Sequence, residues 1–174
     1  MQITASSIPT HSQLSREAAS AYFHDSHAVR LTRTELTALQ IFGRIFGPPP
    51  SWLRVLLKIR NSVMSTFFRL DSPTAAQIDN IVIKDAYAIG ERIGGLWPIC
   101  SLSDTEIVAG RDNRHLDFRV SILKLADQDG ATAFVTTVCH VHGRFGKCYL
   151  FLIAPFHKFS VKRLMADAAA AGRV

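Results

Sequence analysis

The chain has 174 residues, a formal net charge of +6 at neutral pH and a pI near 9.6, and 48% of its residues are hydrophobic. This composition is typical of one ordinary globular domain and excludes an intrinsically disordered chain. The positive charge favours anionic partners in general. No cluster of basic and aromatic residues predicts a nucleic-acid surface.

The sequence also predicts a cytoplasmic location. The longest apolar run, residues 148–156, is interrupted by Pro155 and is shorter than the ~20 residues that cross a bilayer. The first residues lack the basic start and apolar segment of a secretory signal. Three cysteines, Cys100, Cys139 and Cys148, without C-x-x-C spacing favour free thiols in a reducing compartment.

Residues 1–14 are rich in Ser, Thr, Pro and His, and we expect a flexible, poorly packed arm before a single domain of residues 15–174. The stretch "SREAAS" can form a short helix. Residues 21–31 then predict a first strand, because they combine aromatic and β-branched side chains.

Two helices are expected next. Residues 34–46 have apolar side chains at helical spacing, Thr34 is a candidate N-cap, and Gly47 with three prolines ends the helix. Residues 51–70 form the second helix, with Ser51 as its cap and a basic stripe that includes Arg54 and Lys58. That helix is either a core helix with a solvated basic edge or a surface for an anionic membrane.

The following segments read as strands: 80–89, 95–102, 106–111, 115–125 and 132–141. The breaks between them are too short for parallel crossovers, so neighbouring strands are antiparallel. From about Gly146 a long helical segment follows, and Pro155 within it predicts a kink or a restart.

This order predicts an α+β, helix-grip fold. A curved antiparallel sheet of about six strands wraps around the long C-terminal helix, with two helices after the first strand. The alternative is a generic layered α+β sandwich.

Residues 113–124, "NRHLDFRVSILK", alternate apolar and polar side chains. A two-residue turn at Asp129-Gly130 would place Asp117 opposite His142 and Arg119 opposite His140. The same argument at the preceding turns places Glu106 opposite Arg119. One sheet face would then mix aromatic, aliphatic and charged side chains: Trp97, Ile99, Glu106, Val108, His115, Asp117, Arg119, Phe134, His140 and His142.

Two interpretations of this mixed face remain open. On a solvent-facing side, Glu106–Arg119 and Asp117–His142 would be cross-strand ion pairs, each worth ~0.2–1 kcal/mol. On the side that faces the C-terminal helix, the same residues would line a small-molecule pocket.

Other motifs give weaker indications. The three histidines at 115, 140 and 142 with Asp117 have metal-like spacing, but Arg119 nearby would repel a cation, so we expect no metal and no cofactor. Cys139 and His140 leave opposite strand faces, which disfavours a thiol nucleophile. His157 can reach a cavity from the last helix or be half-buried and hydrogen-bonded.

Three segments together resemble a bacterial family of unknown function: "PPPSWLRVLLKIRN" at 48–61, "DNRHLDFRVSI" at 112–122 and "GRFGKCYLFLIAPFHKFSVKRLM" at 143–165. That family is grouped with the START-like, polyketide-cyclase-like helix-grip superfamily. The resemblance covers about residues 20–168. It implies the helix-grip fold with a hydrophobic cavity between sheet and long helix, and it assigns no catalytic residue.

We therefore expect binding of a small apolar or amphipathic ligand with an anionic or hydroxyl group. Trp97, Phe134 and Tyr149 would supply the apolar wall. Arg119 would hold an acidic group, oriented by Glu106 or Asp117. His115, His140 and His142 would be polar anchors.

Two alternatives belong to other functional classes. One is an enzyme for cyclisation, hydration or isomerisation with Asp117 or His140 as acid or base. The other is a membrane-peripheral or protein-interaction module that uses the basic helix 51–70, with weak contact to a membrane surface.

Overall fold

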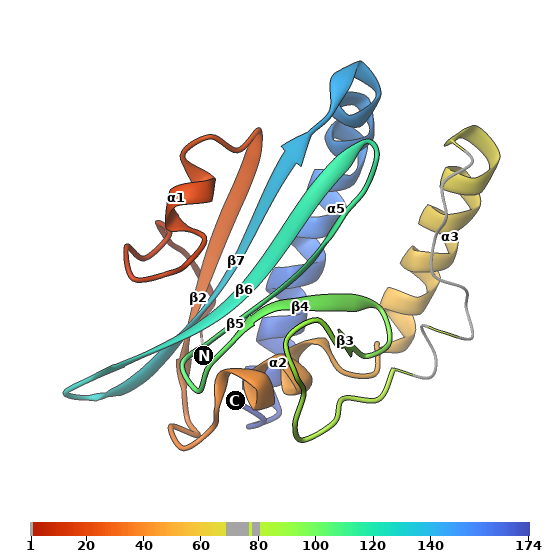
Figure 1. The fold of residues 1–174 in the computed structure, drawn as a ribbon. Helices are drawn as coiled ribbons and strands as arrows, with labels where there is room; N and C mark the ends of the chain where they lie inside the picture. Colours follow the sequence, from red (N-terminus) through yellow and green to blue (C-terminus); the bar gives the residue numbers. More distant parts are fainter. Residues whose placement is uncertain (1, 69–76, 78–80) are drawn as a thin grey trace.

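In a computed structural model of the chain, the described residues form one curved antiparallel sheet of seven strands in the order β1-β2-β7-β6-β5-β4-β3 (Figure 1). The structure describes residues 2–68, 77 and 81–174, except the side chains of residues 62–68. The strands are β1 (Thr4–Ala5), β2 (Phe23–Leu31), β3 (Arg92–Ile93), β4 (Trp97–Leu102), β5 (Glu106–Asp112), β6 (Leu116–Asp127) and β7 (Gly130–Val141). The helices are α1 (Ser15–Ala18), α2 (Ala38–Phe46), α3 (Ser51–Phe68) and α5 (Gly143–Ala170).

These elements confirm the predicted α+β class and the helix-grip arrangement. The long helix α5 and helix α2 lie on one side of the sheet, and α1 lies on the other (Figure 1). The strand expected at residues 80–89 is wrong for residues 81–89, which contain no strand. Residue 80 and the expected end of the second helix, residues 69 and 70, lie outside the described residues.

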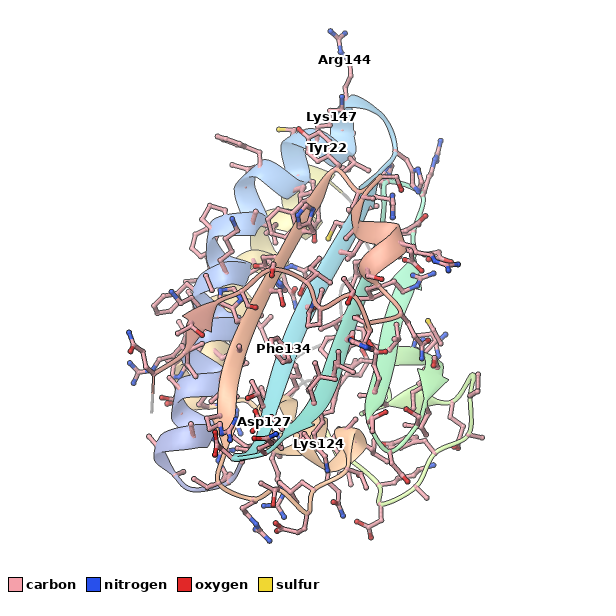
Figure 2. All side chains as sticks on the ribbon, turned by 90° about the vertical axis from the view of Figure 1, so that its left-hand side faces the viewer. Tyr22, Lys124, Asp127, Phe134, Arg144 and Lys147 are labelled. Atoms are coloured by element: carbon pink, nitrogen blue, oxygen red, sulfur yellow. The ribbon has the colours of Figure 1, made fainter. Side chains whose placement is uncertain are left out.

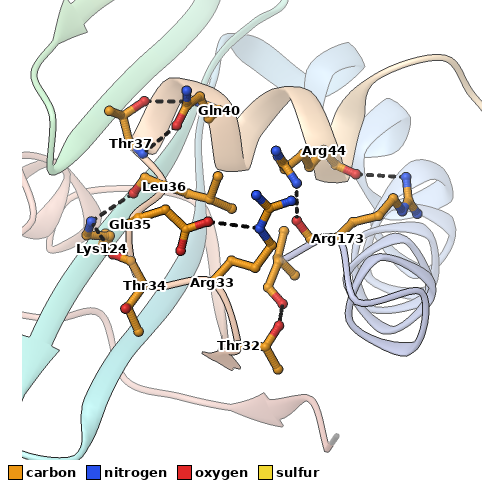
Figure 3. Close-up of polar contacts among 11 residues, drawn as sticks. Thr32, Arg33, Thr34, Glu35, Leu36, Thr37, Gln40, Arg44, Lys124 and Arg173 are labelled. Carbon is orange, nitrogen blue, oxygen red and sulfur yellow. Dashed lines mark hydrogen bonds and ion pairs between the residues drawn. The ribbon is translucent and has the colours of Figure 1, made fainter.

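Helix α2 begins later than the sequence predicts. Thr37, rather than Thr34, is its N-cap: the Thr37 hydroxyl accepts from the Gln40 N–H, and the Gln40 side chain accepts from the Thr37 N–H (Figure 3). The carbonyls of Thr34 and Leu36 instead accept from the Lys124 ammonium on β6 at 3.0 and 2.8 Å. The preceding turn is thus tied to the sheet, and the helix starts only after it.

Helix α5 is continuous through Pro155, so the expected restart is not found. Proline removes one backbone hydrogen bond from a helix interior. The turns that follow Pro155 are anchored by burial, since Val161, Leu164 and Met165 face the sheet and are almost inaccessible to solvent. This packing offsets the loss of one backbone hydrogen bond at Pro155.

The main core lies between the sheet, α2 and the second half of α5. Its members are apolar and buried: Val29, Leu31, Ile41, Phe42, Ile107, Ala109, Val120, Ile122, Val135, Val161, Leu164, Met165 and Ala168. Strands β2, β5, β6 and β7 contribute alternate residues to this helix-facing side, as a period of two requires. The core therefore fixes which sheet face is interior.

The opposite face is covered in part by the N-terminal arm and α1, which lie toward the viewer in Figure 2. Leu14 is only 1% exposed and clusters with Ala18, Val108 and Val138. Near the start of the arm, Thr4 pairs with Ala28 of β2. The expectation of poor packing is wrong for Leu14, which closes the apolar patch on this side, whereas residues 2–11 are all exposed or half-buried. The flexibility of the arm stays a prediction.

The strand registers differ from the predicted ones. Gln128 and Asp129 form the β6–β7 turn, so Asp127 pairs with Gly130 and Asp117 lies opposite His140 instead of His142. The shift is two residues, which preserves the face of every side chain on β7. Between β5 and β6 the shift is four residues, and Glu106 lies opposite Leu123 instead of Arg119.

An irregularity in the pairing between Ile99 and Ser101 changes which side chains of β4 point to each face of the sheet. Ile99 pairs with Ala109, and Trp97 contacts Phe42 and Phe118. Trp97 and Ile99 therefore lie on the helix-facing side, and the prediction that they share a face with Glu106 is wrong. A β-bulge shifts the alternation by one residue, which no two-residue turn argument includes.

None of the helices in the described part of the chain has the length and apolar character to cross a membrane.

Replacing Leu14 by Ala should lower the free energy of unfolding by about 2–5 kcal/mol, since it leaves a cavity in a buried apolar cluster. Chemical denaturation measures the change. Ile89→Ala, at a side chain that is 67% exposed, is the matched control and should change it by less than about 0.5 kcal/mol. Equal effects of the two variants would contradict a packed arm.

Candidate functional site

The mixed face predicted from the sequence is the face turned away from α5. Glu106, Asp117 and Arg119 alternate with Ile107, Phe118 and Val120, and the core that packs against α5 contains Ile107 and Val120. Phe134 and His140 on β7 lie on the same outer face, as the pairs Leu123–Phe134 and Asp117–His140 show. Figure 2 views this face, with Phe134 labelled among the strands.

Glu106 anchors the N-terminal arm. Its buried carboxylate accepts hydrogen bonds from the hydroxyls of Ser12 and Ser121 at 2.7 and 2.5 Å and from the Gln13 N–H at 3.0 Å. These bonds compensate for the loss of water around a buried charge. The partners of this carboxylate are Ser12, Gln13 and Ser121, and Arg119 pairs with Asp112 instead, so Glu106 does not orient Arg119.

Arg119 and Asp117 have separate partners near the surface. Arg119 forms an ion pair with Asp112 at 2.5 Å, and its guanidinium lowers the pKa of the Asp112 carboxyl. Asp117 accepts from the His142 ring at 2.8 Å. The predicted Asp117–His142 contact is thus present despite the shifted register, whereas the predicted Glu106–Arg119 pair is absent.

The remaining predicted residues lie elsewhere. The His115 ring packs at a tilt against Phe145 at the start of α5, with 4.4 Å between ring centroids. Tyr149 is buried, and its hydroxyl accepts from Arg60 of α3 at 2.5 Å. Of the nine residues predicted to bind a ligand, Trp97 and Tyr149 lie on the side that α5 covers, and Glu106, Asp117, Arg119, Phe134 and His140 lie on the outer sheet face.

A different polar cluster lies on the helix-facing side. We call Asp25, His27, Thr137 and His157 the Asp25 cluster. Asp25 and His27 alternate on β2, and Thr137 lies opposite Asp25 on β7. His157 reaches down from α5, with its Nε2 2.9 Å from the Thr137 hydroxyl and 3.9 Å from Asp25 Oδ1. Two strands and the long helix therefore converge on one carboxylate.

Two members of this cluster have buried polar atoms without a hydrogen-bond partner: both carboxylate oxygens of Asp25, and Nδ1 of His27. Buried polar groups are paired in the great majority of cases, and an unpaired one costs about 1–3 kcal/mol. The Asp25 carboxylate and the His27 imidazole can therefore both form further hydrogen bonds, and two such groups side by side are unusual in a protein interior.

Burial also shifts the pKa values of the cluster. Desolvation raises the pKa of Asp25 to about 6, against the opposing charge of Lys158. Desolvation, with His27 and Lys158 acting in the same direction, lowers the pKa of His157 to about 4, and desolvation also lowers the pKa of His27. At neutral pH the cluster holds neutral imidazoles beside a carboxylate that takes up a proton just below neutrality.

A row of apolar side chains on three neighbouring strands lies next to the Asp25 cluster, two residues further along each strand. Phe23 of β2 lies opposite Cys139 of β7, and Cys139 lies opposite Phe118 of β6. Phe23 also places its ring edge-on to His157. Burial raises the pKa of the Cys139 thiol to about 12, so the thiol is protonated at neutral pH and part of an apolar wall.

In the described part of the chain, no group of three or more His, Cys, Asp or Glu side chains is arranged to hold a metal ion.

The sequence contains a signal for the Asp25 cluster. Val29 and Leu31 are core residues of β2, and counting back by twos leads to His27, Asp25 and Phe23. Polar residues at positions of the inward period are candidates for a site.

Replacing Asp25 by Asn should stabilise the protein more at neutral than at acidic pH. The folded-state pKa is raised from 3.8 to about 6, so the folded state binds a proton between these values that the unfolded chain releases. Stability is then lost as pH rises through this window, by up to about 3 kcal/mol above pH 6. Chemical denaturation of both proteins between about pH 4 and pH 7.5 measures the difference.

Asp127→Asn is the control. Asp127 is exposed, and Arg30 lowers its pKa, so this variant should show no gain on raising the pH over the same range. If the stability that Asp25→Asn gains is the same at every pH, burial does not raise the pKa of Asp25 in the folded protein.

Comparison with known proteins places the chain in a family but adds no activity. The profile of a family described as "Protein of unknown function (DUF2867)" matches residues 17–164. Neither the curated proteins nor the solved structures contain a match. Because the profile spans most of the chain, the protein belongs to the DUF2867 family.

Proposed function

We propose that this protein binds a small amphipathic ligand between the sheet and α5, with the polar end of the ligand at the Asp25 cluster. The observation that carries the proposal is the pair of unsatisfied buried groups, the Asp25 carboxylate and His27 Nδ1. A ligand that hydrogen-bonds to them removes the cost of leaving them unpaired. Ligand sites are typically apolar with a few such converging polar groups.

The surroundings support an amphipathic ligand. The apolar row formed by Phe23, Cys139 and Phe118 adjoins Asp25 and Thr137 on the same sheet face. Phe118 continues to Trp97 through an edge-on contact with 6.4 Å between centroids. An alkyl or ring system along this row would place its polar end at Asp25.

The polar end should donate a hydrogen bond. Asp25 is mostly ionised above its pKa of about 6, so it accepts from a hydroxyl or an ammonium and repels a carboxylate. This changes the ligand expected from the sequence, in which Arg119 would hold an acidic group. Arg119 lies on the outer sheet face and pairs with Asp112.

We further infer that the family is related to the START-like, polyketide-cyclase-like superfamily. Support comes from the order of elements: a first strand, helices, an antiparallel meander and a long C-terminal helix against the curved sheet. A cytoplasmic location agrees with three cysteines that are all free thiols.

Three ligands with the same chain and different polar ends test the proposal: decanol, decylamine and decanoate. Near pH 7.5, NMR titration should show decanol and decylamine binding at least about tenfold more tightly than decanoate, because two carboxylates repel in a buried site. Asp25→Asn should reduce this preference. Native mass spectrometry of the freshly purified protein tests in parallel for a co-purified molecule.

Asp117→Asn is the matched control, since it changes the same group on the outer face. It should leave the three affinities unchanged. Absence of binding by all three ligands and of any co-purified molecule would overturn the proposal, as would equal effects of the two variants.

An enzyme is the second candidate, favoured by one observation. A carboxyl group with a pKa of about 6, 3.9 Å from an imidazole nitrogen, can exchange a proton near neutral pH. The acid or base of a cyclisation, hydration or isomerisation would then be Asp25, with His157 beside it, instead of Asp117 or His140 as the sequence predicts.

If a bound compound is identified, incubation with the protein and mass analysis of the products tests for turnover. Conversion should fall by at least about 100-fold in Asp25→Asn, the usual range for a lost acid–base group, and persist in Asp117→Asn. Binding without conversion would leave the protein a ligand carrier and contradict the enzyme.

A further inference from the structure

An apolar stripe follows the outer side of α5. Phe151 is 79% exposed, Phe156 and Phe159 are each 57% exposed, and Leu152 is 44% exposed. Single exposed apolar residues are common, but four large ones within three helical turns form a patch that is typical of an interaction surface. We call these four residues the α5 stripe.

The stripe lies on the side of the helix opposite the core. Phe156 lies four residues after Leu152 and Phe159 lies three residues after Phe156, which keeps them on one side of a helix with 3.6 residues per turn, and Phe151 borders the same side. Leu150, Val161 and Leu164, on the other side, are buried against the protein. The first half of α5 therefore has apolar residues outward as well as inward, whereas a helix of a soluble core normally has a polar outer face.

Helix α3 extends the same surface. Its Trp52 packs edge-on against Phe159 with 5.9 Å between ring centroids, and its Arg60 donates to Tyr149. Val55 and Ile59 of α3 are more than half exposed. Both helices lie on the side of the sheet away from α1 (Figure 1). The outward surfaces of α3 and α5 thus combine apolar side chains from two helices.

The charge of the protein is concentrated in these two helices. Of 20 Lys and Arg residues in the chain, α3 and α5 contain eight; of 14 Asp and Glu residues, they contain only Asp167. The basic residues are Arg54, Lys58, Arg60, Arg144, Lys147, Lys158, Lys162 and Arg163. Arg144 and Lys147 lie at the end of α5 that projects beyond the sheet (Figure 2). The rest of the chain has a slight excess of acidic residues.

We propose that the surface formed by the α5 stripe and the basic residues of α3 and α5 docks onto an anionic lipid bilayer. Exposed aromatic and aliphatic side chains enter the boundary between headgroups and acyl chains, while surrounding Lys and Arg side chains contact anionic headgroups. The absence of carboxylates from α3 and from α5 before Asp167 is the charge complementarity that favours this partner. None of the four residues of the α5 stripe belongs to the Asp25 cluster, so the stripe does not depend on the proposed ligand.

Vesicle flotation with the full chain tests the proposal. Vesicles of phosphatidylcholine alone are compared with vesicles in which about one third of the lipid is phosphatidylglycerol. The wild-type protein should float with the anionic vesicles and stay in solution with the neutral ones. Phe151→Ser with Phe156→Ser should lower the partition coefficient at least about tenfold, because two apolar side chains no longer enter the bilayer.

Two matched variants separate the surface from general effects. Val82→Ser with Ile89→Ser removes equally exposed apolar residues outside both helices and should bind like the wild type. Arg144→Glu with Lys162→Glu should weaken binding at least about tenfold, whereas Arg111→Glu with Arg114→Glu, an equal change in net charge elsewhere, should have a much smaller effect. Asp25→Asn should bind vesicles like the wild type, so failure of the ligand proposal leaves this test intact.

Three results would overturn the proposal. One is failure to bind anionic vesicles. Another is binding that the Phe151→Ser, Phe156→Ser variant retains. The third is a wild-type dimer, measured by light scattering, that the Phe151→Ser, Phe156→Ser variant no longer forms, together with no vesicle binding. That result would assign the stripe to contact with a second copy of the chain.

Discussion

The packing of the second half of α5 against the sheet is the constraint on which the rest of the structure depends. Met165, Val161 and Leu164 meet alternate residues of the central strands and exclude water between them. Burying apolar side chains of this size contributes about 1.5–3 kcal/mol each. This contact decides which sheet face is interior, and it holds the first half of α5 over the neighbouring strands β2 and β7.

That placement explains why the Asp25 cluster exists. His157 lies one turn before the buried part of α5, so the helix carries it to Thr137 and Asp25 as a consequence of the packing. A carboxylate in such a position is costly to the fold, because burial removes water from it. Polar groups retained at a cost in stability are typical of functional sites.

The local pattern of the sequence predicts most elements, because strand and helix periods depend on neighbouring residues alone. It does not decide which face of the sheet is interior. Both faces of β5 and β7 contain apolar residues, with Ile107 and Val135 inside and Val108 and Val138 under the N-terminal arm. The choice depends on contacts with α5, about 25 to 60 residues away in the chain. Alternation is equally compatible with either answer.

The site itself was predictable only in part. The inward positions of β2 follow from the period of two, but the meeting of Asp25 with His157 joins residues more than 130 positions apart. The irregularity at Cys100 is a local feature that the sequence also does not predict: one extra residue in β4 places Trp97 on the helix-facing side. Local patterns contain no information on either event.

The anchoring of Glu106 has a consequence for which residues the arm tolerates. Position 12 supplies a hydroxyl to the buried carboxylate, whereas position 13 supplies only its backbone N–H. The side chain of Gln13 is therefore free to vary without loss of this bond, and proline is the one amino acid that cannot replace it there. The substitutions that positions 12 and 13 tolerate are thus limited by the need for a hydrogen-bond donor to Glu106 rather than by hydrophobicity.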